Sequence, residues 1–328
     1  MKKVFITGIS GQDGIILTSK LLRLNENITV IGTSRHPDLE LFKQKLNIFL
    51  NSKKPINLKI LNIDFSDNIQ IDNIFQNYQP DTVFNLMGPS NVNDSIGNED
   101  YYHKNIYLSF ENLVSSLKTI DKEVKFFQAS SSEMFGISNK PLSENSNLEP
   151  RNPYAIAKYK VKNSIDNKYF DCENITFIEG IMFNHESELR SNKFLIMKII
   201  DDVIKIHKNK LKKTTVGSLE YIRDWSYAGD IMDAVIKMTN LENSKSYVLG
   251  SGVGTSIEKI LELAFNEFNL DWNKFVDVDE RLLRKGDPLT IVSDPSKIQN
   301  ELGWAPMYSI EDIIYKLMKH KIDYESDK

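Results

Sequence analysis

Two short segments in the middle of the chain carry side chains suited to acid–base chemistry. Residues 128–136 read QASSSEMFG, and residues 152–158 read NPYAIAK. The Asn-Pro pair is typical of a helix start, because Asn caps the first turn and Pro fits its first position. Tyr154 and Lys158 then lie on one helical face. We predict that the lysine ammonium lowers the pKa of the phenol, so that Tyr154 can take a proton from a hydroxyl group.

Glu133, which ends the serine run, is the unusual residue of the first segment. A site that only transfers a hydride needs no carboxylate there. A carboxylate whose pKa is raised by burial can first remove a proton and then return it, which is what an elimination requires. The alternative interpretation is a solvated acid at the end of a strand, without a chemical role.

A glycine-rich loop lies at the start of the chain, where residues 7–14 read TGISGQDG after an apolar run. Glycines three residues apart permit a tight turn and close approach of the backbone to a pyrophosphate, and a helix beginning near Asp13 would face that anion. We therefore predict dinucleotide binding rather than a purely structural turn. The predicted cofactor-binding residues are Gly8, Gly11, Gln12, Asp13, Gly14, Arg35, Asp64, Leu86, Tyr154 and Lys158.

The end of the second apolar run favours NADP over NAD as this dinucleotide. Residues 32–37 read GTSRHP, with Arg35 in place and no acid before Asp38. An acid at this point suits a ribose 2′-hydroxyl, whereas an arginine suits a 2′-phosphate. Asp64, at the exit of the third run, is predicted either to contact the adenine or to cap the next helix.

Seven apolar, β-branched runs, with helix-length segments between them, predict the strands and helices that position these residues. Such a pattern is typical of a parallel sheet covered on both faces. We predict an α/β fold with a doubly wound parallel Rossmann sheet in residues 1–183, to which about 223–252 return. A smaller, discontinuous substrate domain would comprise 184–222 and 253–328. The runs span residues 4–10, 28–34, 58–65, 81–87, 125–131, 175–183 and 246–252.

The composition excludes several other classes of protein. A net charge of −4 over 328 residues gives no reason to expect nucleic acid or an anionic membrane as a partner. The single cysteine, Cys172, excludes an internal disulfide and a cysteine-rich zinc site. His185 and Glu186 are adjacent on a strand exit and point opposite ways, so no metal site is predicted. No apolar run approaches the length of a spanning helix, and we expect a cytoplasmic protein.

These motifs resemble those of the extended short-chain dehydrogenase/reductase superfamily, and most closely the GDP-mannose 4,6-dehydratases. That family carries TGITGQDG, QASTSELYG, PRSPYAAAK and GILFNHES, and this chain has TGISGQDG, QASSSEMFG, PRNPYAIAK and GIMFNHES in the same order. The resemblance implies transient oxidation at C4 of a GDP-sugar by NADP, loss of water across C5 and C6, and return of the hydride to C6. It also implies a homodimer or homotetramer.

The same resemblance implies roles for individual residues. Tyr154, tuned by Lys158, would take the proton of the C4 hydroxyl, Ser131 would bridge to that oxygen, and Glu133 would remove the C5 proton. These four residues are the predicted catalytic set. The substrate-binding residues implied by the family motifs are Ser90, Asn184, Lys193, Arg223 and Arg284.

The departures from the family pattern lie on the substrate side. The family's LGAQSHV is LMGPSNV at residues 86–92, and its RPTEV is RKGDP at 284–288. A modified GDP-manno sugar, such as a heptose, therefore stays open as the substrate. Two other functions also stay open: an epimerase or 4-keto reductase acting on a nucleotide sugar, which has no use for Glu133, and a nucleotide-binding protein without catalysis.

Overall fold

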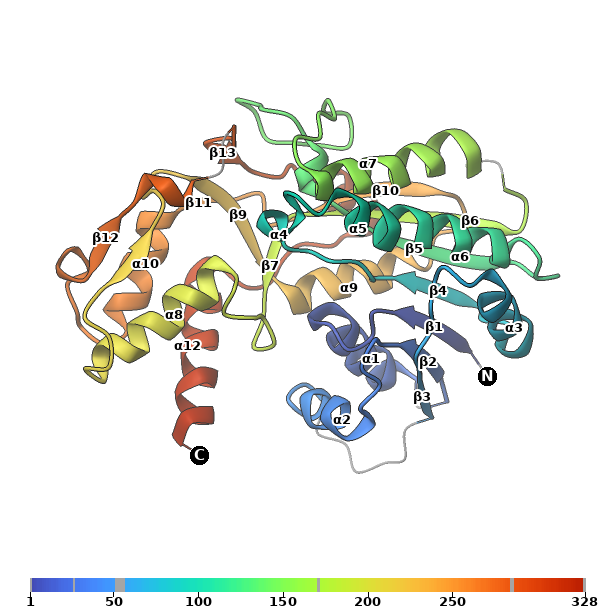
Figure 1. The fold of residues 1–328 in the computed structure, drawn as a ribbon, viewed down its shortest axis with the longest axis horizontal. Helices are drawn as coiled ribbons and strands as arrows, with labels where there is room; N and C mark the ends of the chain where they lie inside the picture. Colours follow the sequence, from blue (N-terminus) through green and yellow to red (C-terminus); the bar gives the residue numbers. More distant parts are fainter. Residues whose placement is uncertain (1, 26, 51–56, 170–171, 284–285, 327–328) are drawn as a thin grey trace.

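A parallel sheet forms the centre of the protein (Figure 1). The computed structural model describes residues 2–25, 27–50, 57–169, 172–283 and 286–326. Within these ranges seven parallel strands lie in the order β10-β6-β5-β4-β1-β2-β3, which confirms the predicted fold class and places each of the seven predicted runs in this sheet. The strands are β1 (Lys3–Thr7), β2 (Thr29–Thr33), β3 (Leu58–Leu61), β4 (Thr82–Asn85), β5 (Val124–Ser131), β6 (Ile175–Met182) and β10 (Lys245–Leu249).

Helices cover both faces of this sheet, which explains why its central strands are apolar almost throughout. One face packs against α1 (Gln12–Leu24), α2 (Leu39–Asn47) and α9 (Ala228–Met238). The opposite face packs against α3 (Asn68–Tyr78), α6 (Ser109–Leu117) and α7 (Pro153–Ser164). The short helices α4 (Val92–Ser95) and α5 (Glu99–Tyr102) lie beside α7.

A second, smaller part of the molecule has its own sheet and its own apolar core. Strand β9 pairs with β7, β11 and β13, and β8 pairs with β12. Three helices pack together into this second core. The elements are β7 (Asn184–Glu186), β8 (Thr214–Val216), β9 (Ile222–Tyr227), β11 (Gly254–Ser256), β12 (Val276–Val278), β13 (Thr290–Ile291), α8 (Leu195–His207), α10 (Ile257–Asn266) and α12 (Ile310–Ser326).

The chain passes between the two parts more than once. The segment predicted to return to the large sheet, about 223–252, does so only in part. Strand β9 pairs in the small sheet, whereas β10 pairs in the large sheet and α9 packs against it. Helix α11 (Ser296–Leu302) also packs on the large layer through Ile298, and Trp304 follows it there. The predicted domain boundaries remain an interpretation of these contacts.

A buried ion pair fastens α7 to the sheet. Glu179, in the middle of β6, is 1% exposed and accepts hydrogen bonds from Ser130 Oγ at 2.6 Å, Ser246 Oγ at 2.7 Å and Lys162 Nζ at 2.9 Å. Lys162 lies on α7, one turn after Lys158. The pair therefore fixes the helix that carries Tyr154 against β6, and through Ser130 the same carboxylate also holds β5, the strand that ends at Ser131. Within the described ranges, none of the helices combines the length and the apolar character needed to cross a bilayer.

Candidate active site

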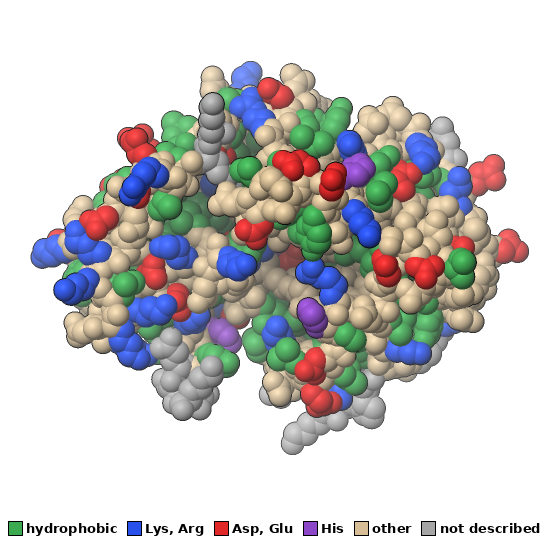
Figure 2. All heavy atoms as spheres, viewed as in Figure 1, with side chains coloured by type: hydrophobic (Ala, Val, Ile, Leu, Met, Phe, Trp, Pro, Cys, Tyr) green, Lys and Arg blue, Asp and Glu red, His purple; other side chains and the backbone are tan. Residues whose placement is uncertain are grey.

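The two parts of the molecule enclose a cavity of about 610 Å³ at the carboxyl ends of the central strands. Figure 2 shows the molecule hollowed between them. Arg35 and Asp64 lie outside the lining, and Arg284 lies outside the described residues. The predicted site residues that line the cavity are Gly8, Gly11, Gln12, Asp13, Gly14, Leu86, Ser90, Ser131, Glu133, Tyr154, Lys158, Asn184, Lys193 and Arg223.

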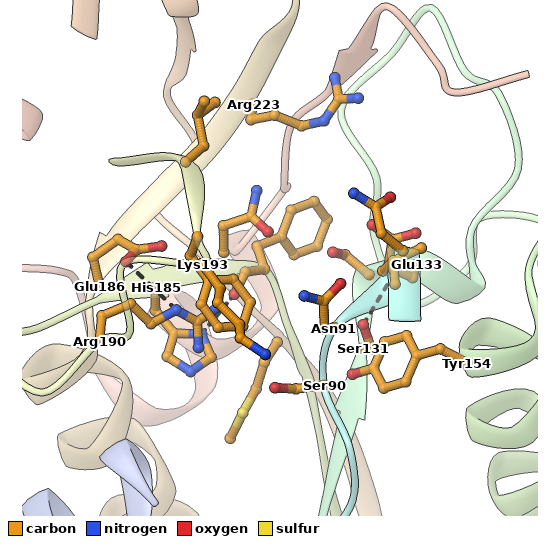
Figure 3. A pocket seen from close by; sticks show the side chains of 18 of the residues that line it. Ser90, Asn91, Ser131, Glu133, Tyr154, His185, Glu186, Arg190, Lys193 and Arg223 are labelled. Atoms are coloured by element: carbon orange, nitrogen blue, oxygen red, sulfur yellow. Dashed lines mark hydrogen bonds and ion pairs between the residues drawn. The ribbon is translucent and has the colours of Figure 1, made fainter. Parts of the chain in front are cut away.

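The end of β5 brings Ser131, Glu133 and Tyr154 together (Figure 3). Ser131 is the last residue of the strand, and its Oγ accepts a hydrogen bond from the Glu133 backbone N–H at 3.2 Å. This bond caps a short helical turn, Ser132–Met134, which directs Glu133 into the cavity. The Ser131 hydroxyl is also hydrogen-bonded to the Tyr154 side chain. A hydroxyl, a phenol and a carboxylate thus converge on one space.

Helix α7 begins as predicted, with Asn152 at its N-cap and Pro153 at its first position. The Asn152 side chain accepts from the Ala155 N–H at 2.8 Å. Tyr154 and Lys158 face the sheet from the first turns of the helix, and Lys158 is buried. Its Nζ donates to the Ala129 carbonyl at 2.6 Å and lies 5.9 Å from the centroid of the Tyr154 ring.

The electrostatics of this pair differ from the prediction that Lys158 lowers the tyrosine pKa. Burial raises the pKa of Tyr154 to about 12, the hydrogen bond from Ser131 opposes the rise, and the Glu133 charge adds to it. Burial also lowers the pKa of Lys158 to about 8. The reason is that desolvation acts on both groups, while the ammonium is directed at the Ala129 carbonyl. The phenol is therefore protonated at neutral pH in this structure.

The glycine loop after β1 has the backbone geometry that a pyrophosphate site needs. Gly8 has φ +68°, in the left-handed region where side chains are strained. A Cβ on Gly14 would lie 2.6 Å from both Cα and the carbonyl oxygen of Ile9, so only glycine allows α1 to pack this close to the loop. Helix α1 begins at Gln12 and points its N-terminus into the cavity.

His185 is a site residue that sequence reasoning assigned no role. Its Nε2 lies 3.1 Å from Asp13 Oδ2, and its Nδ1 lies 2.7 Å from the Phe183 carbonyl oxygen. Burial favours the uncharged forms of both side chains, but their mutual attraction lowers the pKa of Asp13 to about 2 and raises that of His185. The motif NHES marks His185 in the sequence, but nothing in it indicates Asp13 as the partner. Among the described residues, no three His, Cys, Asp or Glu side chains gather as metal ligands.

Glu186 and Arg190 form a second charged pair that sequence reasoning missed. Arg190 Nε lies 3.5 Å from Glu186 Oε2, and the guanidinium carbon lies 3.5 Å above the Phe194 ring. Burial raises the pKa of Glu186, while Arg190 and His185 oppose the rise. Within the described part of the chain, Glu186 Oε2 and Arg190 Nε are buried without a hydrogen-bond partner. Both residues line the cavity beside Lys193 (Figure 3).

Arg35 and Asp64 lie beyond the cavity, at the ends of β2 and β3. The Arg35 guanidinium donates to the Tyr101 hydroxyl at 2.8 Å and is exposed. Asp64 accepts from the Ser66 N–H and hydroxyl at 2.9 and 2.7 Å, and the Ser66 bonds lower its pKa. Asp64 does not cap α3, because Asp67 takes that position.

On the opposite wall, Arg223 is held by groups of the protein itself. Its guanidinium donates to the Leu289 carbonyl at 3.1 Å and lies 3.1 Å from Asp287 Oδ2. Asn184 lies on β7, which pairs with the strand that carries Arg223. Ser90 lies in the loop after β4, and the Tyr102 hydroxyl donates to the carbonyl of the next residue, Asn91, at 2.6 Å. These contacts fix both walls of the cavity.

Comparisons with known proteins agree with this geometry. In fold, the chain is similar to UDP-glucuronic acid 4-epimerase from Bacillus cereus in complex with UDP-glucuronic acid and NAD (TM-score 0.84, 18% identity, 98% of this chain and 99% of that one). It is also similar to RMD from Pseudomonas aeruginosa complexed with NADPH (TM-score 0.81, 18% identity, 100% of both chains). These likenesses show that the chain has a Rossmann-type α/β fold.

The sequence comparisons narrow this class to one family. The profile of the family described as GDP-mannose 4,6 dehydratase matches residues 5–317. GDP-mannose 4,6 dehydratase 2 of Arabidopsis thaliana is 31% identical over 329 residues, which cover 98% of this chain and 86% of the relative. GDP-mannose 4,6-dehydratase of Vibrio cholerae serotype O1 is 27% identical, with 98% and 94% covered. The chain belongs to the GDP-mannose 4,6-dehydratase family and is an enzyme of the hydro-lyase class.

Proposed function

We propose that the protein is an NADP-dependent 4,6-dehydratase of a GDP-hexose, converting GDP-mannose to GDP-4-keto-6-deoxymannose. The observation that carries the proposal is the carboxylate of Glu133 in the same cavity as the hydrogen-bonded pair of Ser131 and Tyr154. A site that only oxidises or epimerises a sugar has no use for that carboxylate. The names of the relatives support the reaction and the sugar nucleotide.

The residues present fit a dinucleotide. The positive φ of Gly8 and the close packing at Gly14 leave a cradle at the N-terminus of α1 that any Cβ would narrow. Arg35, at the end of β2, would hold the 2′-phosphate of NADP, and Asp64 lies at the adenine end. When bound there, the dinucleotide would supply reversible hydride transfer with the sugar.

Tyr154 would take the proton of the C4 hydroxyl while Ser131 orients that oxygen. Burial raises the pKa of Tyr154 to about 12, so the phenol must be ionised before it can act as this base. Lys158 would support this step through its ammonium group. Oxidation at C4 makes the C5 hydrogen acidic, since the resulting carbanion is delocalised onto the ketone.

Glu133 would remove the C5 proton and deliver it to the departing C6 hydroxyl, which leaves as water. When hydride returns to C6, C5 would take up a proton that comes from solvent. Its place on the turn after β5 keeps it in the cavity wall beside Ser131. Asn184, Lys193 and Arg223 line the wall where the diphosphate and nucleoside would lie. Arg284, the remaining predicted contact, lies outside the described residues.

Two further parts of the proposal rest on the sequence. The departures at residues 86–92, among them Pro89 and Asn91 in the cavity wall, keep a modified GDP-manno sugar such as a heptose as the alternative substrate. We propose a homodimer or homotetramer, in keeping with the family resemblance. A nucleotide-sugar epimerase or 4-keto reductase is the alternative reaction.

The test is to incubate the purified protein with GDP-mannose and to read the mass of the product. A product lighter by one water, formed without added reductant, supports the dehydratase. A product of unchanged mass, isomerised at one centre, would identify an epimerase. Assays with GDP-mannoheptose in parallel show which of the two sugars is the better substrate, by comparison of their kcat/KM values.

A further inference from the structure

Asn152 contacts two functional elements through one amide group. Its Oδ1 accepts from the Ala155 N–H at 2.8 Å and so caps α7. Its Nδ2 donates to Glu133 Oε2 at 3.0 Å. One side chain therefore connects the first turn of the helix that carries Tyr154 with the carboxylate on the turn after β5.

Capping alone does not require an asparagine at this position. Asp38, Asp67 and Ser256 cap α2, α3 and α10 by the same kind of bond to a backbone N–H. Among the side chains that cap helices well, Asn alone has an oxygen for the backbone and a separate NH₂ group for a second partner. The NH₂ group of Asn152 donates to Glu133, so an asparagine at this position does more than stabilise the helix.

We propose that Asn152 is a positioning residue for Glu133, holding its carboxylate at a fixed place beside Ser131 and Tyr154. The proposal rests on the proposed function, in which Glu133 moves the C5 proton. The hydrogen bond from Nδ2 fixes the orientation of the carboxylate, because it holds one of its two oxygens. Because the same amide caps α7, it also holds Glu133 at a fixed distance from Tyr154.

The charged and titratable groups near Glu133 can affect a pH profile. Tyr154 faces it from α7, and burial and the Glu133 charge both raise the pKa of that phenol. Arg151, next to Asn152, pairs with Glu149 at 3.0 Å. The backbone N–H of Glu149 in turn donates to the Met134 carbonyl of the turn at 2.8 Å.

The decisive variant is Asn152→Asp, which keeps the size of the side chain and its capping oxygen. It places a second carboxylate oxygen at the position from which Nδ2 donates to Glu133. Two carboxylates in contact retain a proton to higher pH, so the acid limb of the kcat profile should move up by about one to two pH units. The KM for GDP-mannose should change by less than about two-fold. An unmoved acid limb would overturn the proposal.

Two further variants separate positioning from folding. Asn152→Ser keeps a capping hydroxyl and loses the longer donor, so kcat should fall about ten-fold with little change in KM. Asp271→Asn exchanges similar side chains at the cap of a short turn, Trp272–Lys274, in the second part of the molecule, and should leave the profile unchanged.

A thermal-unfolding cycle tests the contact without any turnover. Asn152→Asp should lower the unfolding temperature of the wild type, and this drop should vanish in the Glu133→Gln background, where the new amide donates to the new carboxylate. Equal drops in both backgrounds would overturn the contact. If the cycle shows coupling but the wild type does not dehydrate GDP-mannose, the proposed function fails, and the catalytic role of Asn152 fails with it.

Discussion

Replacing Lys162 by Met should destabilise the protein strongly, because it leaves a buried carboxylate without its cation. Glu179 is 1% exposed, the Lys162 side chain is 12% exposed, and their charged atoms lie 2.9 Å apart. Removing one partner of a buried pair costs about 3–5 kcal/mol. The hydroxyl donors Ser130 and Ser246 remain, so we expect the lower end, about 3 kcal/mol.

Urea denaturation followed by circular dichroism measures this change. Lys162→Met combined with Glu179→Gln should recover most of the loss, because no unpaired charge stays buried. Lys160→Met, at an exposed position of the same helix, should change the free energy of unfolding by less than about 0.5 kcal/mol. The reasoning is refuted if Lys162→Met costs less than about 1 kcal/mol or if the double variant is no better than the single one.

The pH dependence of this loss has a defined sign. Burial alone would lower the pKa of Lys162, but Glu179 and Asp166 outweigh it and raise the pKa. A lysine whose pKa is raised by folding stabilises the protein fully at pH values below its pKa in the unfolded chain, about 10.4. This contribution is lost as the pH rises through the pKa in the folded protein. The difference between wild type and Lys162→Met should thus be constant from neutral to mildly alkaline pH and shrink above it.

Three other predictions concern the cofactor side and the buried lysine. Burial lowers the pKa of Lys158 to about 8, so the unfolded chain binds more protons than the folded protein between pH about 8 and about 10. The free energy of unfolding of the wild type, measured by urea titration relative to Lys158→Met, should therefore rise over this range. A fall over the same range would contradict the lowered pKa. Arg35→Ala should weaken NADP about ten- to hundred-fold and NAD much less, and calorimetric titration giving equal losses would remove Arg35 from the 2′-phosphate site. Gly14→Ala, whose Cβ would lie 2.6 Å from Ile9 Cα, should weaken NADP at least about ten-fold in the same assay while the protein still folds; unchanged binding would count against the cradle.

The large sheet could be predicted from the sequence because its signal is local and strong. The central strands, which are buried on both faces, are apolar runs, and helix-length segments separate most of the runs. The small sheet could not be predicted in this way, because its strands are short: β13 (Thr290–Ile291) has two residues and β11 (Gly254–Ser256) three. Their pairing depends on β9, which lies far away in the sequence.

The place of the candidate site was predictable for a geometric reason. The glycine loop and Leu86 follow parallel strands and Ser131 ends one, and the carboxyl ends of parallel strands meet at one edge of a sheet. The electrostatics were not predictable, because burial decides them. Lys158 is four residues from Tyr154 in the sequence, yet desolvation raises the tyrosine pKa instead of the lysine lowering it. The contact between Asp13 and His185 joins residues 172 positions apart and had no sequence signal of its own.

The central claim is that Glu133 exchanges the C5 proton of the sugar, and the most direct measurement is the reaction with GDP-mannose in deuterated water. Mass spectrometry and NMR of the product locate the deuterium. We predict that the wild type places solvent deuterium on C5 of the 4-keto product, and that Glu133→Gln binds NADP normally but places none. Deuterium at C5 at the wild-type rate in Glu133→Gln would contradict the claim.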